Sequence, residues 1–533
     1  MDSLFHVDGK PFFSIGGQLN NSTSSDPALT EKAFKTCVGL GLNTVAAPVH
    51  WELFEKEEGA YFAQIDMLME LARRSGLRLV VLWFGTWKNG NSHYVPEWVK
   101  LQKERFLWAK ANDGAEIRSL SPTCEETKKA DMRAFCELCG HIARNNADGC
   151  VIGIQIENEP GLIGAARDYS PQSTKLFKGR IPADAAEFIG ADGTWEETFG
   201  FYAAEVFTAY HIAHYIDDIA EAGKRVLDLP MYINVWLGEM YAHIPGTNYP
   251  SGGAVTKTFR FWKHLLKHVD AIAPDIYVSD YREVEELFRT YSGEGNIFHL
   301  PESSPMPLSM TNSMRAVAEY GLTGVHTFGI DILSAAADRA ALCTMAASGA
   351  EGAKKSALLR EIADSYTILR HSKHLIEKYQ GTGRLYAVAQ YEGAANQVFD
   401  FGSYIGEIEF LNMESAPING GNVRRMDNRH MASSYDGYRA KGFIVDAGNG
   451  EFYLTGDAYK LRLYPKFSLE ELTSAVHAGD FLNTRSQGYL SVTEGEFTAD
   501  GEYKVNIIRN GDEYDYGLWV TSDIGVLRVR MDR

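Results

Sequence analysis

The sequence predicts an α/β protein in which a (β/α)8 TIM barrel is followed by a smaller antiparallel β-sandwich domain. The first two thirds of the 533 residues repeat one rhythm: a short apolar run, a polar loop and an amphipathic stretch. Near residue 375 the pattern changes to short segments of alternating polarity. We therefore place the barrel domain at residues 1–375 and the β-sandwich domain at residues 376–533. The 45% hydrophobic and 23% charged residues are typical of a globular chain.

Eight apolar runs predict the barrel strands. Most show no alternation, as expected of parallel strands that are buried on both faces. In order they are Phe12 to Gly16, Asn43 to Pro48, Arg78 to Phe84, Gly149 to Ile156, Pro230 to Trp236, Ala271 to Tyr277, Asn296 to Pro301 and Thr323 to Phe328. Helical patterns lie between them, at Thr30 to Leu40, Gln64 to Arg74, Lys128 to Asn145, Thr198 to Ala222 and Thr258 to His268.

A doubly wound open sheet is the alternative to the barrel. Such a sheet usually carries a glycine-rich phosphate turn after an early strand. The sequence contains neither GxGxxG nor GxxxxGK[ST], so the barrel is favoured.

The second domain begins after a long helical stretch that ends near Lys378. Alternating segments and Asn-Gly turn pairs then predict antiparallel hairpins packed as a sandwich. The segments are Arg384 to Gln390, Gln397 to Phe401, Gly450 to Thr455 and Tyr503 to Ile508, and the turn pairs are Asn449-Gly450 and Asn510-Gly511.

Charge and composition exclude several classes of partner. A net charge of −18 repels nucleic acid and anionic lipid, and no stretch reaches 18 uncharged apolar residues. Residues 1–15 lack the apolar run of a secretory signal, and the six scattered cysteines indicate reduced thiols, so we expect a cytoplasmic protein. The CxxC pair Cys136 and Cys139 lies in an amphipathic pattern and is interpreted as core packing. A homo-oligomer is compatible with the sequence.

Two carboxylates follow predicted barrel strands, where the active site of this fold lies. Strand four ends in Asn158-Glu159-Pro160 and strand seven ends in Glu302. Taken singly, the first could be a capped helix start and the second a loop glutamate. Together they stand on opposite sides of the barrel mouth, which favours retaining glycoside hydrolysis. In that reaction Glu159 is the acid/base with a raised pKa, and Glu302 is the nucleophile.

The string Ile154 to Glu159, Ile-Gln-Ile-Glu-Asn-Glu, resembles the signature of glycoside hydrolase family 35 β-galactosidases. Their clan keeps Asn-Glu after strand four and a Glu after strand seven. The resemblance implies that Asn158 binds the sugar 2-hydroxyl, Glu159 is the acid/base and Glu302 the nucleophile. It also implies that Tyr277, at strand six, hydrogen-bonds the nucleophile.

The resemblance covers roughly residues 5–340, with further matches at Pro48 to Glu55 and Ala273 to Tyr277. It implies a retaining exo-β-galactosidase that releases terminal β-linked galactose from an oligosaccharide or glycoside. The segment Leu82 to Gly90 departs from the family, because it lacks the Asn-x-Glu sugar clamp after strand three. Trp87, by stacking, and Lys88, by donating to a hydroxyl, are candidate replacements; a packed tryptophan and a solvated lysine are the alternatives.

Three further residues are predicted to bind substrate. Trp236, at the end of strand five, is a candidate stacking platform or else a core tryptophan. Gln18 stands at the end of strand one, where Gly16 to Asn21 also departs from the family pattern, and Glu52 follows strand two.

The reaction is predicted to need no cofactor and no metal. HxH, HExxH and paired CxxC spacings do not occur in the sequence, and His299 and His326 are interpreted as core histidines. Two other functions stay open. One is another clan activity, β-glucosidase-like, β-mannosidase-like or family 42-like; the other is an inactive carbohydrate-binding protein whose β-domain does the recognition.

Overall fold

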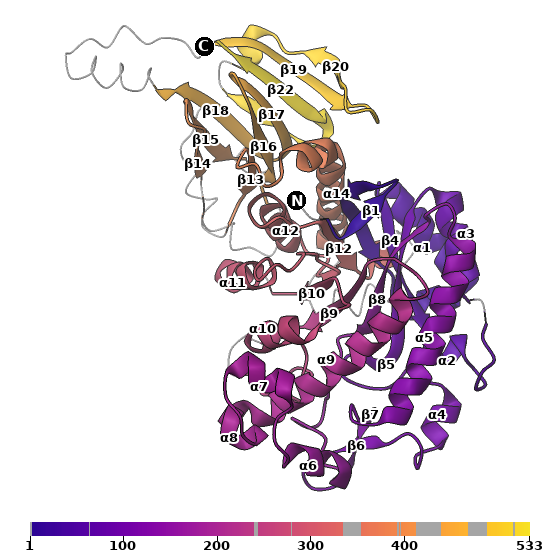
Figure 1. Ribbon diagram of the computed structural model, residues 1–533. Coiled ribbons are helices and arrows are strands. Elements are labelled where there is room, and N and C mark those ends of the chain that lie inside the picture. Colours follow the sequence, from indigo (N-terminus) through magenta and orange to yellow (C-terminus); the bar gives the residue numbers. More distant parts are fainter. Residues whose placement is uncertain are drawn as a thin grey trace. The chain divides into compact units, whose positions relative to one another are not determined.

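The computed structural model describes residues 3–62, 64–238, 243–278, 280–333, 353–391, 394, 396–411, 439–466, 488–514 and 517–532 (Figure 1). The chain forms two compact units. The first consists of residues 2–304 and 323–334, and the second of residues 305–322 and 335–533 with Met1. The domain boundary at residue 375 stays a prediction.

The first unit is built on eight parallel strands in the order β11-β10-β9-β8-β5-β4-β3-β12. Their bounds are β3 Ser14–Gln18, β4 Thr44–His50, β5 Arg78–Lys88, β8 Val151–Asn158, β9 Met231–Trp236, β10 Ala271–Ile276, β11 Glu302–Ser303 and β12 Gly324–Phe328. Strand β12 pairs with β3, and a parallel bridge between Leu300 and Val325 joins the remaining edge. The predicted barrel is confirmed.

The seventh strand differs from the prediction, because β11 lies directly after the predicted run from Asn296 to Pro301 and only Leu300 of that run forms a bridge. Only β11, Glu302–Ser303, pairs with β10, through Asp275 opposite Glu302 and Ile276 opposite Ser303. Pro301 has no N–H to donate to a neighbouring strand, which accounts for the break between the Leu300 bridge and β11.

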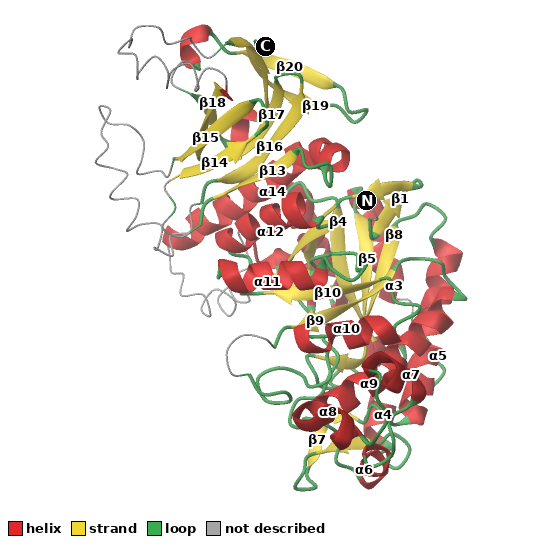
Figure 2. Cartoon of the chain, turned by 60° about the vertical axis from the view of Figure 1, so that its left-hand side comes forward, coloured by secondary structure: helices red, strands yellow, loops and turns green. Residues whose placement is uncertain are grey.

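Helices cover the outside of these strands, as the red and yellow ribbons of Figure 2 show. The bounds are α1 Pro27–Gly39, α2 Trp51–Phe54, α3 Gln64–Ser75, α4 Glu97–Leu101, α5 Glu125–Asn145, α6 Pro171–Phe177, α7 Ala183–Ile189, α8 Trp195–Phe199, α9 Ala203–Lys224, α10 Thr256–Leu265 and α11 Tyr281–Tyr291. Asp26 accepts a hydrogen bond from the Leu29 N–H and Pro27 begins the helix, so α1 starts three residues before the predicted pattern at Thr30.

The interior of the barrel is closed at one end by a hairpin of β1 Phe5–Val7 and β2 Lys10–Phe12. The ring of Phe5 is fully buried and packs edge-on against Tyr232 and His299. A Cβ on Gly153 would lie 2.4 Å from this ring, which explains a glycine within β8. A second hairpin, β6 Trp108–Lys110 and β7 Glu116–Leu120, follows β5 in the chain.

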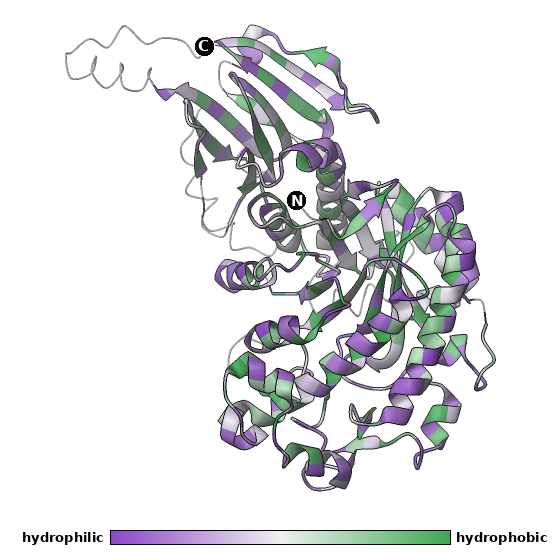
Figure 3. Cartoon of the chain, in the orientation of Figure 1, coloured by the Kyte–Doolittle hydropathy of each residue, from purple (hydrophilic) through white to green (hydrophobic). Residues whose placement is uncertain are grey.

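The second unit contains two antiparallel sheets. The sheets have the orders β13-β16-β17-β22-β19-β20 and β14-β15-β18-β21. The strands are β13 Leu385–Ala389, β14 Asn396–Asp400, β15 Tyr404–Phe410, β16 Lys441–Gly448, β17 Glu451–Asp457, β18 Tyr459–Pro465, β19 Tyr489–Phe497, β20 Tyr503–Ile508, β21 Leu518–Val520 and β22 Val526–Met531. Hydrophilic and apolar residues alternate along several of them (Figure 3). One buried cluster unites both sheets, with Ile408 and Leu461 from one and Leu454 and Val529 from the other.

The two predicted Asn-Gly turns differ in the structure. Asn449 and Gly450 both have positive φ, 57° and 75°, and join β16 to β17 as a hairpin. Asn510 instead caps a short 3-10 helix, Gly511–Glu513, whose Glu513 side chain bonds back to the Asn510 N–H. A cap and a tight turn use the same asparagine side chain, so the dipeptide alone does not separate them.

Helices α12, Pro307–Tyr320, and α14, Ala353–Tyr379, belong to the second unit. α12 follows β11 in the chain but packs against α14 and β13. The side chain of Gln380 donates hydrogen bonds to the carbonyls of Val317 and Leu322 at the end of α12. None of the helices formed by the described residues has the length and apolar character needed to cross a bilayer.

Candidate active site

Polar side chains gather where the barrel strands end. The register sets Asp275 opposite both Glu302 and Trp236, and Lys88 opposite Asn158. Because the carboxyl ends of parallel strands meet at one face of a barrel, these residues share one site.

Glu302 is buried and accepts hydrogen bonds from four neutral side chains. Gln18 Nε2 lies 2.7 Å, Asn158 Nδ2 3.2 Å and Asn234 Nδ2 3.4 Å from its Oε1. The Tyr277 hydroxyl donates to its Oε2 at 2.8 Å. N–H and O–H donors aimed at both oxygens stabilise a carboxylate anion.

Glu159 is buried and has a different environment. Its backbone N–H donates to Asn234 Oδ1 at 2.8 Å, and Asn89 Nδ2 donates to its Oε2 at 2.5 Å. Burial, and next the negative charge of Glu302, raise the pKa of Glu159 to about 7, although Lys88 acts in the opposite direction. A carboxyl group with this pKa can hold a proton near neutral pH and still release it.

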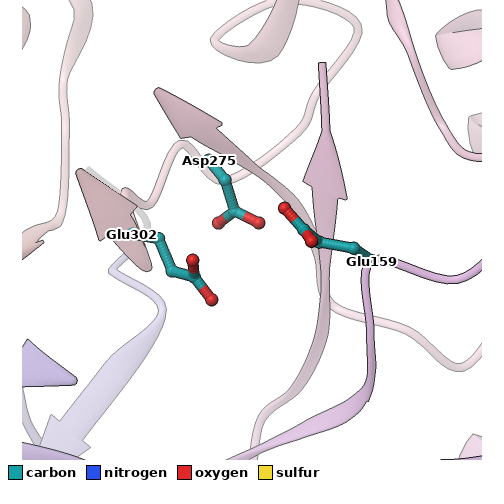
Figure 4. A group of neighbouring side chains, drawn as sticks. All are labelled: Glu159, Asp275 and Glu302. Carbon is teal, nitrogen blue, oxygen red and sulfur yellow. The ribbon is translucent and has the colours of Figure 1, made fainter. Parts of the chain in front are cut away.

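The two glutamates and Asp275 face one another (Figure 4). One oxygen from each lies within 4.8 Å of the others. Retaining glycosidases hold their two carboxyl groups roughly 5 to 5.5 Å apart. The spacing of Glu159 and Glu302 therefore suits attack and protonation at a single anomeric centre.

Three carboxylates this close could also hold a cation. Among the described residues, they are the one such group of His, Cys, Asp or Glu side chains. However, donors from Gln18, Asn158 and Tyr277 already occupy lone pairs of Glu302. We interpret the cluster as hydrogen-bonding acids rather than metal ligands, and the metal-free reaction stays a prediction.

Asp275 and Asn234 are site residues that the sequence analysis did not single out. Asn234 contacts all three acids, because its Nδ2 also donates to Asp275 Oδ2 at 2.7 Å. Both residues stand two positions before a predicted site aromatic, Trp236 or Tyr277. Side chains two apart on a strand share a face, so this spacing was the available signal.

Lys88 is buried and orients Asn158. Its Nζ donates to Asn158 Oδ1 at 2.8 Å, which leaves the Asn158 Nδ2 to face Glu302. Lys88 is therefore not a solvated lysine, because its ammonium binds the side-chain amide of Asn158 within the site.

Trp87 requires a correction. Its ring is fully buried, packs edge-on against Tyr215, and its Nε1 donates to Ser119 Oγ. A ring with no open face cannot stack on a sugar, so the stacking contact is not available to Trp87. It is a packed tryptophan, as in the alternative interpretation, and it lies near the end of β5 rather than in a loop.

Two aromatic residues at the strand ends do have open surface. Trp236 is 37% and Tyr277 46% exposed, whereas the Tyr277 hydroxyl reaches inward to Glu302. Glu52 lies on α2, where its carboxylate pairs with Lys100 Nζ at 3.1 Å. It takes part in none of the hydrogen bonds given above for Glu159 and Glu302.

A second pair of acids lies behind the site. Glu157 is fully buried and accepts hydrogen bonds from the backbone N–H groups of Thr86, at 3.0 Å, and Trp87, at 2.6 Å. Asp131, on α5, accepts from Trp83 Nε1 and Thr86 Oγ1. Burial and the nearby Asp131 raise the pKa of Glu157 well above its usual range. This pair fixes the end of β5, which carries Lys88.

The backbone at the end of β8 is strained. Glu157 and Glu159 have positive φ values of 61° and 47°, which non-glycine residues adopt at a cost of roughly 1 kcal/mol or more. Such strain clusters at functional sites, where surrounding contacts enforce it. Here the hydrogen bonds to Thr86, Trp87 and Asn234 supply those contacts.

Comparison with known proteins adds family assignments for two segments. Residues 4–218 match the model of Glycosyl hydrolases family 35, and residues 362–521 match a domain of unknown function, DUF5597. No curated protein sequence matches the chain.

Several solved structures are similar to the chain. The β-galactosidase of Bacillus circulans sp. alkalophilus is 17% identical, with a TM-score of 0.48 over 68% of this chain and 57% of that one. The β-galactosidase of Halorubrum lacusprofundi is 15% identical, with a TM-score of 0.42 over 60% and 52%. The β-amylase catalytic domain of Paenibacillus polymyxa is 14% identical, with a TM-score of 0.46 over 64% and 100%. The chain thus spans little more than half the length of either galactosidase.

Proposed function

This chain carries a glycosyl hydrolase family 35 domain, and from this premise we propose that it is a retaining exo-β-galactosidase. The proposed reaction releases terminal β-linked galactose from an oligosaccharide or glycoside. One observation carries the proposal: oxygens of Glu159 and Glu302 approach within 4.8 Å, and four side chains donate hydrogen bonds to Glu302 whereas one, Asn89, donates to Glu159.

In the first step, a Glu302 oxygen attacks the anomeric carbon and the bond to the leaving oxygen breaks. Glu159 gives its proton to that oxygen. Asn158 and Gln18 hold Glu302 in place for attack, since both donate to its Oε1. The products are a galactosyl ester on Glu302 and the free aglycon.

In the second step, Glu159 removes a proton from water while the water oxygen attacks the anomeric carbon. The ester bond breaks and Glu302 regains its charge. The pKa of Glu159 falls when Glu302 is esterified, because the charge that raised it is gone. This change lets one side chain act first as an acid and then as a base.

Substrate binding is proposed to use the open aromatic faces beside the acids. Trp236 and Tyr277 offer ring surface for the apolar face of a galactose ring. Asn158, whose Oδ1 accepts a hydrogen bond from Lys88, is proposed to bind the 2-hydroxyl, as the family resemblance implies. The cytoplasmic location and a homo-oligomer stay predictions that fractionation and sedimentation would test.

A panel of nitrophenyl β-glycosides tests the proposal. We expect the β-galactoside to have the highest kcat/KM among β-galactoside, β-glucoside and β-mannoside, and NMR to detect the β-anomer of galactose as the first product. Glu302→Gln should be inactive, whereas Glu286→Gln, which removes the same charge from an exposed position of α11, should not change the rates. Absence of β-galactoside hydrolysis by the natural protein would overturn the proposal.

A further inference from the structure

Asp275 is a third acid in a site where retaining hydrolysis needs two. It is buried at the end of β10, and its Oδ2 accepts a hydrogen bond from Asn234 at 2.7 Å. Among the residues that the structure describes, no donor reaches its Oδ1. An orphaned buried acceptor costs about 1 to 3 kcal/mol, so its presence beside the catalytic acids calls for an explanation.

Most of the groups that face Asp275 disfavour its ionisation, and the ammonium of Lys88 acts in the opposite direction. Glu159 and Glu302 are close acids, Tyr232 and Tyr277 are neutral phenols, and the ammonium of Lys88 already binds Asn158. Burial and the two neighbouring carboxyl groups raise the pKa of Asp275 well above its usual range. Three buried anions within 4.8 Å would repel one another strongly, so at least one of them holds a proton.

Asn234 determines which oxygen of Asp275 can carry a proton. The backbone N–H of Glu159 can only donate, so the Asn234 atom that it meets is the carbonyl Oδ1. The Asn234 amide therefore turns its Nδ2 toward Asp275 Oδ2 and Glu302 Oε1. Oδ2 must then act as an acceptor, which leaves Oδ1 as the oxygen that can be protonated.

We propose that Asp275 stays protonated on Oδ1 and donates a hydrogen bond to the carboxyl group of Glu159, as a positioning residue for the acid/base. The inference rests on the proposed function. The bond stabilises the Glu159 anion that forms when the leaving group takes its proton. It also holds that anion ready to accept a proton from water in the second step. Asp275 keeps its own proton throughout the cycle.

The pH profile distinguishes a protonated Asp275 from an ionised one. Asp275→Ala removes the hydrogen bond, so Glu159 should lose its proton less readily and the alkaline limb of kcat/KM should shift up by roughly half to one pH unit. Asp275→Asn keeps a neutral donor and should leave the limb within about 0.3 pH units of the natural protein, with kcat several-fold lower. An ionised Asp275 predicts the opposite: both variants remove a negative charge and move the limb down, which would overturn the proposal.

The matched control is Asp280→Asn. Asp280 is exposed and caps α11 through the N–H groups of Arg282 and Glu283. Asparagine caps a helix as well as aspartate does, so this variant removes one charge nearby without disturbing the fold. Its pH limb should not move.

An infrared measurement tests the proton without any substrate. The difference spectrum between natural protein and Asp275→Asn at pH 8 should show a protonated carboxyl band that the variant has lost. Absence of this band, or its disappearance on adding Mg²⁺ or Ca²⁺, would overturn the proposal, the latter because a cation would then replace the proton. If the natural protein hydrolyses no glycoside, the proposed function fails, whereas the band still decides whether Asp275 carries a proton.

Discussion

Glu157 and Glu159 lie two residues apart at the end of β8, yet they belong to two different clusters of acids. Glu157 faces backbone N–H groups that use both of its oxygens. Glu159 faces Glu302 and Asp275 across the barrel mouth. The comparison teaches that the neighbours of a buried carboxyl group, and not its burial, separate a structural acid from a chemical one.

The largest expected effect comes from removing Glu302, the carboxylate that accepts hydrogen bonds from four side chains. Glu302→Gly should lower kcat on a nitrophenyl β-galactoside by about 10⁴-fold or more, since no other group can form the ester. Azide should restore part of the turnover with an activated substrate by entering the space that the side chain leaves. Steady-state kinetics with and without azide measure both. A variant with the natural rate would remove Glu302 as nucleophile.

Glu159→Ala should have an effect that depends on the leaving group. A phenyl galactoside needs protonation and should lose roughly 10³-fold in kcat/KM, whereas a dinitrophenyl galactoside should lose about tenfold or less. The kcat/KM values of the variant and of the natural protein on each substrate give the two losses and their ratio. Equal losses would mean that another group is the acid.

Stability measurements should separate the two clusters by sign. Burial and Glu302 raise the pKa of Glu159 to about 7 from an ordinary value of 4.5. The folded protein therefore binds this proton more tightly than the unfolded chain, and stability falls as pH rises through that window. Glu159→Gln removes this loss and should raise the free energy of unfolding at pH 8, by up to about 3 kcal/mol.

Glu157→Gln should act in the opposite direction at pH 5, where the raised pKa of Glu157 costs little stability and its hydrogen bonds dominate. An amide offers one acceptor oxygen where Glu157 offers two, so its NH2 group would face the donor N–H of Thr86 or Trp87, although the Thr86 N–H keeps a second acceptor in Asp131 Oδ2 at 3.2 Å. We expect a loss of about 2 kcal/mol in the free energy of unfolding. Urea denaturation of both variants at pH 5 and pH 8 measures the difference. A loss for Glu159→Gln at pH 8, or no loss for Glu157→Gln at pH 5, would refute the distinction between the clusters.

The sequence was sufficient to predict seven of the eight barrel strands and the two opposed glutamates, whereas β11 lies just after the run that was predicted for it. Apolar runs without alternation place parallel strands, and residues directly after them must lie at the barrel mouth. Four more of the predicted site residues also stand at strand ends, and in the structure each contacts another residue of the site. They are Asn158, Tyr277, Gln18 and Lys88.

Other features depend on contacts that the sequence does not encode locally. Trp87 was assigned to the sugar, but whether its ring faces the barrel mouth or Tyr215 depends on how β5 ends. The oxygen of Asp275 that accepts a hydrogen bond is determined by the orientation of the Asn234 amide. That orientation is in turn determined by the backbone N–H of Glu159, in another part of the chain. The packing of α12 against α14 and β13 likewise joins segments far apart in the chain.

Lys88 gives the smallest expected effect, because it reaches the acids only through charge and through Asn158. Lys88→Met keeps the aliphatic stem but removes the ammonium that lowers the pKa of Glu159 and orients the Asn158 amide. The alkaline limb of kcat/KM should shift up by about half a pH unit, and kcat should fall roughly tenfold. Lys100→Met, which breaks only the ion pair with Glu52, is the matched control and should keep the limb in place. A downward shift in Lys88→Met would mean that the pKa of Glu159 does not set the alkaline limb. The pH data would then no longer support a chemical role for Glu159 in contrast to Glu157.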